Sequence, residues 1–150
     1  MRAVVQRVSE ASVQIDAKQV TSIKHGMLVL LGIEHEDNEQ DADWLSGKLV
    51  RMRIFQDEND HMNLSVLDTQ GEAIVVSQFT LHASTKKGNR PSFIKAAKPD
   101  KAQLLYQYFI SIFEKQLGKP VGTGEFGAMM DVSLINDGPV TIIIDSKQKH

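Results

Sequence analysis

Apolar residues alternate with polar ones near the start of the chain. Val4, Val8, Val13 and Ile15 stand among polar neighbours, and β-branched residues are enriched there, which is typical of a strand. The apolar run Met27–Ile33 is continuous and short. This run predicts a second, buried strand.

Two later segments repeat their apolar residues at helical spacing. Asp37, with Gln40 three residues later, predicts a capping box at the start of the first helix. The apolar face of that helix is formed by Ala42, Leu45, Leu49 and Met52. Pro99 suits the first turn of the second helix, and Gly118 can end it. Its apolar residues are Ala102, Leu105, Phe109, Ile112 and Phe113.

The remaining apolar runs are short and strand-like. Ala73–Phe79 follows a turn, and Asn136–Pro139 separates the run Met129–Ile135 from the run Val140–Asp145. The polar stretch 84–91 is too irregular for a helix or strand, so we expect a loop. Many strands with two helices predict an α/β fold with antiparallel pairing.

Length and composition narrow the class of protein. The 150 residues suit one domain over 1–150, and 41% hydrophobic with 24% charged residues excludes a disordered chain. The lack of cysteine excludes a disulfide scaffold, a thiol nucleophile and thiolate-bound metals. The sequence has no signal peptide and no apolar run of the roughly 20 residues that a membrane helix needs. We therefore expect a cytoplasmic protein without a membrane partner.

The charge balance bears on nucleic-acid binding. The net charge is −2, from 17 basic and 19 acidic residues. Proteins that grip many phosphates along a duplex usually carry a basic excess. We therefore expect no DNA partner, and we expect any contact with nucleic acid to be local.

The common catalytic and cofactor motifs are absent. No two histidines have the i, i+4 spacing of a helical metal site; they are His25, His35, His61, His82 and His150. The chain also lacks the Gly-x-Gly-x-x-Gly, P-loop and Gly-x-Ser-x-Gly patterns. We therefore expect neither a metal nor a cofactor.

Polar residues follow Ile74–Val76 at the end of the strand-like run. They are Ser77, Gln78 and Thr80, with Phe79 among them. Hydroxyl and amide groups beside free backbone N–H groups can form an oxyanion site or position a water molecule. The alternative is a strand end capped by its own Ser and Thr, an arrangement that these residue types favour.

Two further segments offer chemistry to a ligand. Lys86, Lys87 and Arg90 lie in a Gly-containing loop that could hold phosphates, or could simply be solvated. Gly138-Pro139 reads as a turn, but its peptide bond could be cis. A cis bond would turn two carbonyl oxygens the same way, so that the backbone could bind an ammonium group and leave no space for a side chain.

Taken together, these segments resemble the D-aminoacyl-tRNA deacylase family. The family's Ser-Gln-x-Thr motif matches Ser77–Thr80, and its Gly-Pro motif matches Gly138-Pro139. The Thr-Gly-x-Phe-Gly-Ala segment matches Thr123–Ala128, and the loop 87–93 and the opening 1–8 also match. The motifs occur in the family's order over almost the whole chain.

The resemblance implies a fold, a reaction and an assembly. The fold would be a compact three-layer β/β/α domain. The enzyme would hydrolyse the ester between a D-amino acid, or mischarged glycine, and the terminal ribose at the 3′ end of tRNA, a proofreading step in translation. It would act as a homodimer, in which Gly138-Pro139 of one protomer enters the pocket of the other and rejects L-side chains.

The resemblance also implies the site residues. Ser77, Gln78, Phe79 and Thr80 would be catalytic, with the backbone N–H groups around Phe79 and Thr80 stabilising the oxyanion. The substrate-binding residues would be Gly138, Pro139, Phe126, Gly127, Ala128 and Met130. Lys86, Lys87 and Arg90 would be candidates for contact with tRNA phosphates. His82 stands where an aromatic such as Tyr is expected, and the sequence assigns it no chemical role.

The route of catalysis depends on Thr80. A Thr hydroxyl needs a base to become a nucleophile, and no His or free amine is positioned by the sequence to serve. We therefore favour RNA-assisted hydrolysis, in which the ribose 2′-hydroxyl orients or activates water, over a covalent Thr80 intermediate. Two other functions stay open from the sequence: a non-catalytic tRNA- or amino-acid-binding module, and an esterase for small D-amino acid esters.

Overall fold

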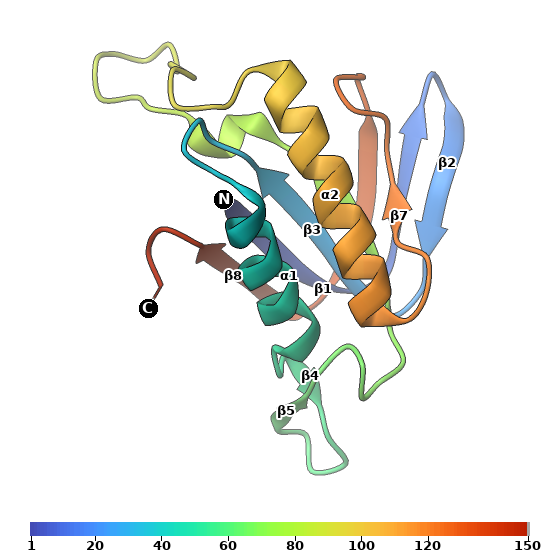
Figure 1. Ribbon diagram of the computed structural model, residues 1–150. Coiled ribbons are helices and arrows are strands. Elements are labelled where there is room, and N and C mark those ends of the chain that lie inside the picture. Colours follow the sequence, from blue (N-terminus) through green and yellow to red (C-terminus); the bar gives the residue numbers. More distant parts are fainter. Residues whose placement is uncertain (150) are drawn as a thin grey trace.

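The structure is a computed structural model that describes residues 1–149, so His150 lies outside the described residues. Its main sheet is arranged around β1 (Arg2–Ile15), which pairs antiparallel with three strands. These are β2 (Lys18–Ile23), β3 (Gly26–Gly32) and β8 (Asp131–Asp145). The predicted antiparallel pairing is confirmed for these strands (Figure 1).

Parallel pairs complete the sheet on the other side of β3. There, β3 pairs with β6 (Glu72–Ser77), and β6 pairs with the short β7 (Gly122–Thr123). The crossover between β3 and β6 contains a helix, as a parallel connection usually does. It also contains a hairpin of β4 (Phe55–Gln56) and β5 (Met62–Leu64).

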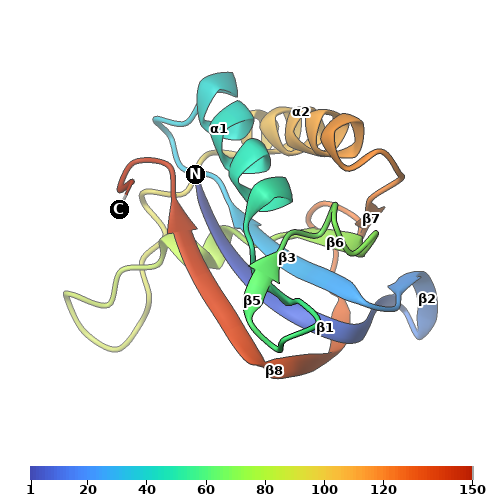
Figure 2. The same ribbon diagram turned by 90° about the horizontal axis from the view of Figure 1, so that it is seen from below.

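Two helices, α1 (Glu39–Arg51) and α2 (Pro99–Leu117), cover one face of the sheet (Figure 2). Between helices and sheet lies the larger core, which includes Leu45, Phe109 and Phe113. A second core, which includes Val13, Leu28 and Val76, joins the long strand β1 to β3 and β6. The helix layer and two sheet halves packed on this second core form the three-layer β/β/α arrangement that was predicted.

The helix ends follow local sequence signals, with one correction. Pro99 opens α2, and Gly118 ends it in the left-handed conformation with φ 78°. The capping box of α1, however, is formed by Asn38 and Asp41 instead of Asp37 and Gln40. Asp37 is not available as a cap because its buried carboxylate accepts hydrogen bonds from the Met1 ammonium and the Glu34 amide.

Two predicted strand boundaries are also corrected. The strand predicted over 73–79 ends at Ser77, and the chain then forms a 3₁₀ turn, η1 (Phe79–His82). The two strands predicted over 129–135 and 140–145 are one strand, β8, with a local irregularity. Its register with β1 shifts between the pairs Gln6–Thr141 and Val8–Asn136, so residues 137–140 bulge beside Arg7. Hydrophobic pattern alone does not distinguish such a bulge from a hairpin turn.

Candidate functional site

A cavity of about 710 Å³ opens at the end of β6. One wall is η1, a second is the start of α2, and a third is the segment 126–132. All four predicted catalytic residues line it: Ser77, Gln78, Phe79 and Thr80. The residues predicted from the family's second motif line it as well: Phe126, Gly127, Ala128 and Met130. The fold thus brings together two segments that are about 50 positions apart in the sequence.

Within residues 1–149, the backbone at the start of η1 has two amide groups without an assigned acceptor, and both belong to residues that line the cavity. The amides on either side are used, since Gln78 donates to the Leu31 carbonyl and Leu81 donates to the Gln78 carbonyl. Among residues 1–149, no acceptor is assigned to the amides of Phe79 and Thr80. Two unused N–H groups beside an exposed hydroxyl provide the donors that an ester oxygen needs as it becomes negative.

The Thr80 hydroxyl has a donor beside it and no base. Its oxygen accepts a hydrogen bond from the Gln78 side-chain amide. No carboxylate or imidazole in the described part of the chain lies within hydrogen-bond distance of this oxygen. Without a base to remove its proton, the hydroxyl is a weak nucleophile that is better suited to positioning.

Tyr106 lies behind the wall of the cavity, next to the lining residue Phe126, and it was not predicted from the sequence. Its hydroxyl donates to the Val75 carbonyl at 2.7 Å, and its ring centroid lies 6.1 Å from that of Phe126. Burial raises the pKa of Tyr106 to about 12, so the hydroxyl remains a donor at physiological pH. Tyr106 was not among the apolar residues predicted for its helix, α2. The available signal was its hydroxyl, which needs a partner when buried.

Gly138 and Pro139 lie outside this cavity. Both are exposed on the β8 bulge, and the peptide bond between them is cis. Gly138 has φ 141°, and a Cβ atom there would lie 2.8 Å from Cγ2 of Val140. Within one protomer, the fold therefore does not bring the Gly-Pro motif to Ser77–Thr80.

Arg7 holds the bulge in place and was also missed from the sequence. Its Nε donates to the Asp137 carbonyl at 2.8 Å, and its NH1 donates to the Ile54 carbonyl at 2.8 Å. Its side chain is buried and forms an ion pair with Asp137 at 3.5 Å. A signal existed, because Arg7 follows Ala3 and Val5 at the alternate positions that face the core.

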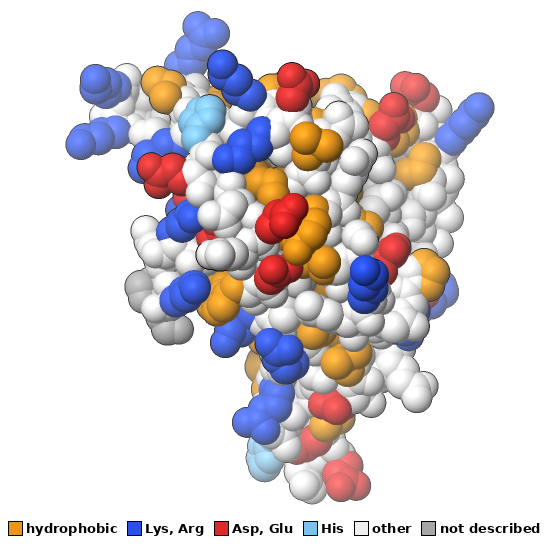
Figure 3. Space-filling view, viewed as in Figure 1, with side chains coloured by type: hydrophobic (Ala, Val, Ile, Leu, Met, Phe, Trp, Pro, Cys, Tyr) orange, Lys and Arg blue, Asp and Glu red, His pale blue; other side chains and the backbone are white. Residues whose placement is uncertain are grey.

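The predicted cationic loop projects beside the cavity. Lys86, Lys87 and Arg90 are exposed, and none of them forms an ion pair with any residue in the range 1–149. Figure 3 shows Lys and Arg side chains gathered on this projecting part of the molecule. The Phe93 ring, at the base of the loop, packs edge-on against Phe79 with centroids 5.0 Å apart. The loop is therefore attached to the wall of the cavity.

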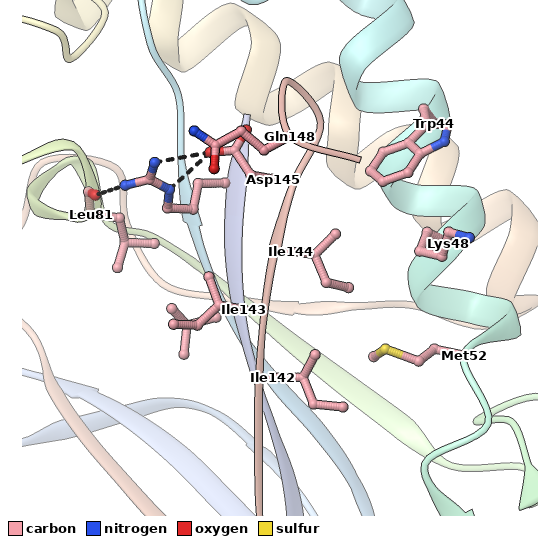
Figure 4. Close-up of a pocket in the computed structure, with 11 residues that line it drawn as sticks. Trp44, Lys48, Met52, Leu81, Ile142, Ile143, Ile144, Asp145 and Gln148 are labelled. Carbon is pink, nitrogen blue, oxygen red and sulfur yellow. Dashed lines mark hydrogen bonds and ion pairs between the residues drawn. The ribbon is translucent and has the colours of Figure 1, made fainter. Parts of the chain in front are cut away.

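A second cavity of about 710 Å³ lies between α1 and β8 (Figure 4). Ile142 and Ile144 point toward Trp44 and Met52 of the helix side, whereas Ile143 points the other way. Its walls are mostly apolar, and none of the predicted site residues lines it. The predicted catalytic residues thus lie at the cavity at the end of β6 and not at this one.

The described residues contain neither a cluster of metal ligands nor a membrane-spanning helix. No group of three or more His, Asp or Glu side chains in residues 1–149 is arranged to hold a metal ion. No helix there is both long enough and apolar enough to span a membrane.

Known proteins resemble this chain in sequence and in fold. Residues 4–145 match the family model described as D-Tyr-tRNA(Tyr) deacylase. The chain is 65% identical to the D-aminoacyl-tRNA deacylase of Christiangramia forsetii and 58% identical to that of Bacteroides thetaiotaomicron. Each of these alignments covers 100% of both chains.

Two solved structures have a similar fold. The c-Myc DNA Unwinding Element Binding Protein superposes with a TM-score of 0.92 and 41% identity, over 97% of this chain and 98% of that one. A probable eukaryotic D-amino acid tRNA deacylase superposes with a TM-score of 0.80 and 17% identity, over 95% of this chain and 97% of that one. At 17% identity, this second likeness concerns the fold alone.

Proposed function

The chain belongs to the D-Tyr-tRNA(Tyr) deacylase family, and on that premise we propose that the cavity at the end of β6 is where it hydrolyses D-aminoacyl-tRNA. The protein is a hydrolase of the ester between a D-amino acid and tRNA. The observation that carries the proposed site is the pair of unused amides of Phe79 and Thr80 at its edge.

In the proposed reaction, water adds to the ester carbonyl carbon. The amides of Phe79 and Thr80 donate to the carbonyl oxygen while it carries negative charge. The bond from carbon to the ribose oxygen then breaks, and that oxygen takes the proton that water loses. The products are the free amino acid and tRNA. Because no base in residues 1–149 lies beside Thr80, the ribose 2′-hydroxyl orients the attacking water, and Ser77 and Gln78 position the substrate.

The rejection of L-amino acids is assigned to a second protomer. Gly138 and Pro139 are exposed and lie away from the cavity of their own chain, so they can enter only the cavity of another copy. An L-side chain would collide with this backbone, whereas the α-ammonium could bond to its carbonyls, and glycine would be accepted. A clash of this kind rejects a competitor more strongly than favourable contacts alone.

A homodimer is supported by the same strand. One edge of β8 pairs with β1, and its other edge pairs with no strand in the described residues. Ile135 and Ile143, which flank the bulge along β8, are 54% and 70% exposed. An open strand edge with exposed apolar side chains is suited to contact with a second copy. Sedimentation of the full chain should give twice the mass of one protomer, and a monomer at all concentrations would contradict this assembly.

The tRNA partner is contacted next to the reacting ester. Lys86, Lys87 and Arg90 would bind phosphates near the 3′ end, and such local contact agrees with the net charge of −2. Charged tRNA is a cytoplasmic substrate, so we place the activity in the cytoplasm. The DNA binding named for the c-Myc element protein belongs to that protein, and nothing in our proposal requires DNA.

The proposed function is tested by hydrolysis of paired substrates. D-tyrosyl-tRNA and L-tyrosyl-tRNA are incubated with the enzyme, with and without EDTA, and the remaining ester is measured. We expect rapid loss of the D-ester only, unchanged by EDTA. Equal loss of both esters would contradict the chiral filter and favour a general esterase. Loss of neither ester would favour a binding module.

A further inference from the structure

His82 closes η1, directly after the residues assigned to catalysis, and its side chain is 2% exposed. Its Nε2 is the one buried side-chain nitrogen or oxygen in residues 1–149 without a hydrogen-bond partner. Its Nδ1 lies 4.0 Å from Oε2 of Glu34, whose side chain is 20% exposed. A buried imidazole with one unpaired nitrogen needs an explanation, because an unpaired buried polar group lowers stability.

The turn η1 rests on the end of β3 without a gap. A Cβ atom on Gly32 would lie 3.0 Å from Cβ of Leu81 and 3.1 Å from Cδ2 of His82. The Gln78 amide donates to the Leu31 carbonyl at 2.8 Å, immediately before the turn. Any movement of the imidazole is therefore passed to the backbone that carries Phe79 and Thr80, since close-packed groups cannot shift independently.

The charged groups around His82 come from few elements. β3 itself has no titratable side chain, and the segment after it contributes Glu34. From β1, Arg2 donates to the Leu81 carbonyl at 2.8 Å and is paired with Asp145 of β8 at 3.0 Å (Figure 4). The Arg2 contact anchors the middle of the turn through its backbone, so the His82 side chain is the titratable anchor at its end.

We propose that His82 is a positioning residue that fixes the oxyanion-binding amides, and that adding a proton to its ring loosens them. In the neutral ring, a hydrogen on Nδ1 faces the Glu34 carboxylate and Nε2 is left without one. A second proton places an N–H on Nε2, where the buried surroundings hold no acceptor. The turn must then move to expose or pair that group. This inference rests on the proposed function of the cavity.

The first test compares hydrolysis rates at saturating enzyme, so that binding and product release do not contribute. The side-chain amide of His82→Asn can still face Glu34 but does not titrate. We expect the hydrolysis rate of this variant to be within about 3-fold of the original at pH 7.5. In acid, its rate should not show the decrease that protonation of His82 causes in the original protein.

For His82→Leu, we expect a rate about 10-fold below that of the original at pH 7.5, because small displacements of positioned groups are costly. This variant should show no acid loss from position 82, and the enzyme concentration that gives half of its maximal rate should be unchanged.

The matched control is His25→Gln, at an exposed histidine that packs edge-on against Phe55 with centroids 5.0 Å apart. Its pH profile should equal that of the original protein. The proposal is overturned if His82→Asn keeps the same acid loss, or if His82→Leu hydrolyses as fast as the original. If the original protein hydrolyses no D-aminoacyl-tRNA at any pH, the proposed function fails instead.

A measurement without substrate keeps the inference testable if these variants fold poorly. In the original protein, NMR should show the amide resonances of Phe79 and Thr80 shifting with the same midpoint as the His82 ring. Resonances that stay constant while the ring titrates would overturn the coupling, whatever the activity.

Discussion

Thr80 has an exposed hydroxyl that accepts a hydrogen bond from Gln78, and no base in the described part of the chain lies beside it. We therefore expect Thr80→Ala to lower the rate of D-aminoacyl-tRNA hydrolysis by less than about 10-fold, because the backbone amides remain in place. Single-turnover kinetics measure this rate. A burst of acyl-enzyme in the original protein, or complete inactivity of the alanine variant, would indicate a covalent Thr80 intermediate instead.

Gly138 has both a positive φ and no room for a side chain. A Cβ atom would lie 2.8 Å from Val140 Cγ2 and 3.2 Å from NH2 of Arg7. We expect Gly138→Ala to displace the bulge and raise hydrolysis of L-tyrosyl-tRNA relative to the D-ester, with a stability loss of about 1–3 kcal/mol. Gly118→Ala is the matched control, since Gly118 has φ 78° but open space around it and ends α2 away from the cavity. Unchanged selectivity in Gly138→Ala would contradict the filter.

At the scale of elements, the loop 84–91 carries the cations assigned to tRNA and is attached to the wall of the cavity. We expect the double variant Lys87→Ala, Arg90→Ala to hydrolyse D-aminoacyl-tRNA more slowly and with a weaker salt dependence. Each lost phosphate contact should reduce the slope of log affinity against log salt by about 1. Turnover of a small D-amino acid ester should be unchanged. Lys18→Ala, on the distant strand β2, serves as the control.

A reduction that is equal at all salt concentrations, or that also affects the small ester, would show that the loop acts on the cavity itself. The small-ester assay also separates the tRNA enzyme from the esterase alternative. Fast turnover of the small ester with no preference for tRNA would favour the esterase.

Helix α2 is attached to β6 by the hydrogen bond from Tyr106 to the Val75 carbonyl. Tyr106→Phe removes its hydrogen bond to the Val75 carbonyl, so we expect a loss of about 1 kcal/mol in the free energy of unfolding. Tyr108→Phe is the matched control. Its hydroxyl bonds Asp43 at an exposed position, where the bond is expected to contribute little. Urea unfolding measures both, and equal losses would contradict the role of burial.

At the scale of the whole molecule, Asp41 links α1 to the segment just after β8, and Asp145 links the end of β8 to β1. Burial alone would raise the pKa of Asp41, but hydrogen bonds from Ser146, Lys147 and Asn38 outweigh it and hold the pKa below the usual value. Asp145 behaves alike, because the Lys147 amide and Arg2 outweigh its burial and lower its pKa.

Carboxylates with lowered pKa values stabilise the fold above their usual pKa of about 3.9, and this contribution disappears as the pH falls through the lower folded values. We therefore expect the melting temperature to drop below about pH 4, and to drop less steeply in Asp41→Asn. Glu58→Gln, at an exposed turn, should retain the full dependence. Identical profiles for Asp41→Asn and the original protein would contradict this account.

Local patterns in the sequence predicted much of the molecule. Periodic apolar residues placed both helices, and Pro99 and Gly118 marked the ends of α2, because those effects act within one or two turns. The motifs of the resemblance identified the family, and the segments 77–80 and 126–130 meet in one cavity. The helices, their ends and the motifs depend on residue type and near neighbours, so the sequence alone determined them, whereas the meeting of the two segments in one cavity depends on the fold.

Other features were decided only by tertiary structure. Asn38 replaces Asp37 as the cap because Asp37 pairs with the distant Met1 ammonium. The burial of Arg7 beside Asp137 and the packing of His82 on Gly32 also join segments that are far apart in the chain. Whether a polar side chain is solvated, paired or left without a partner depends on what the fold brings next to it. No local pattern contains that information, since the neighbour comes from another part of the sequence.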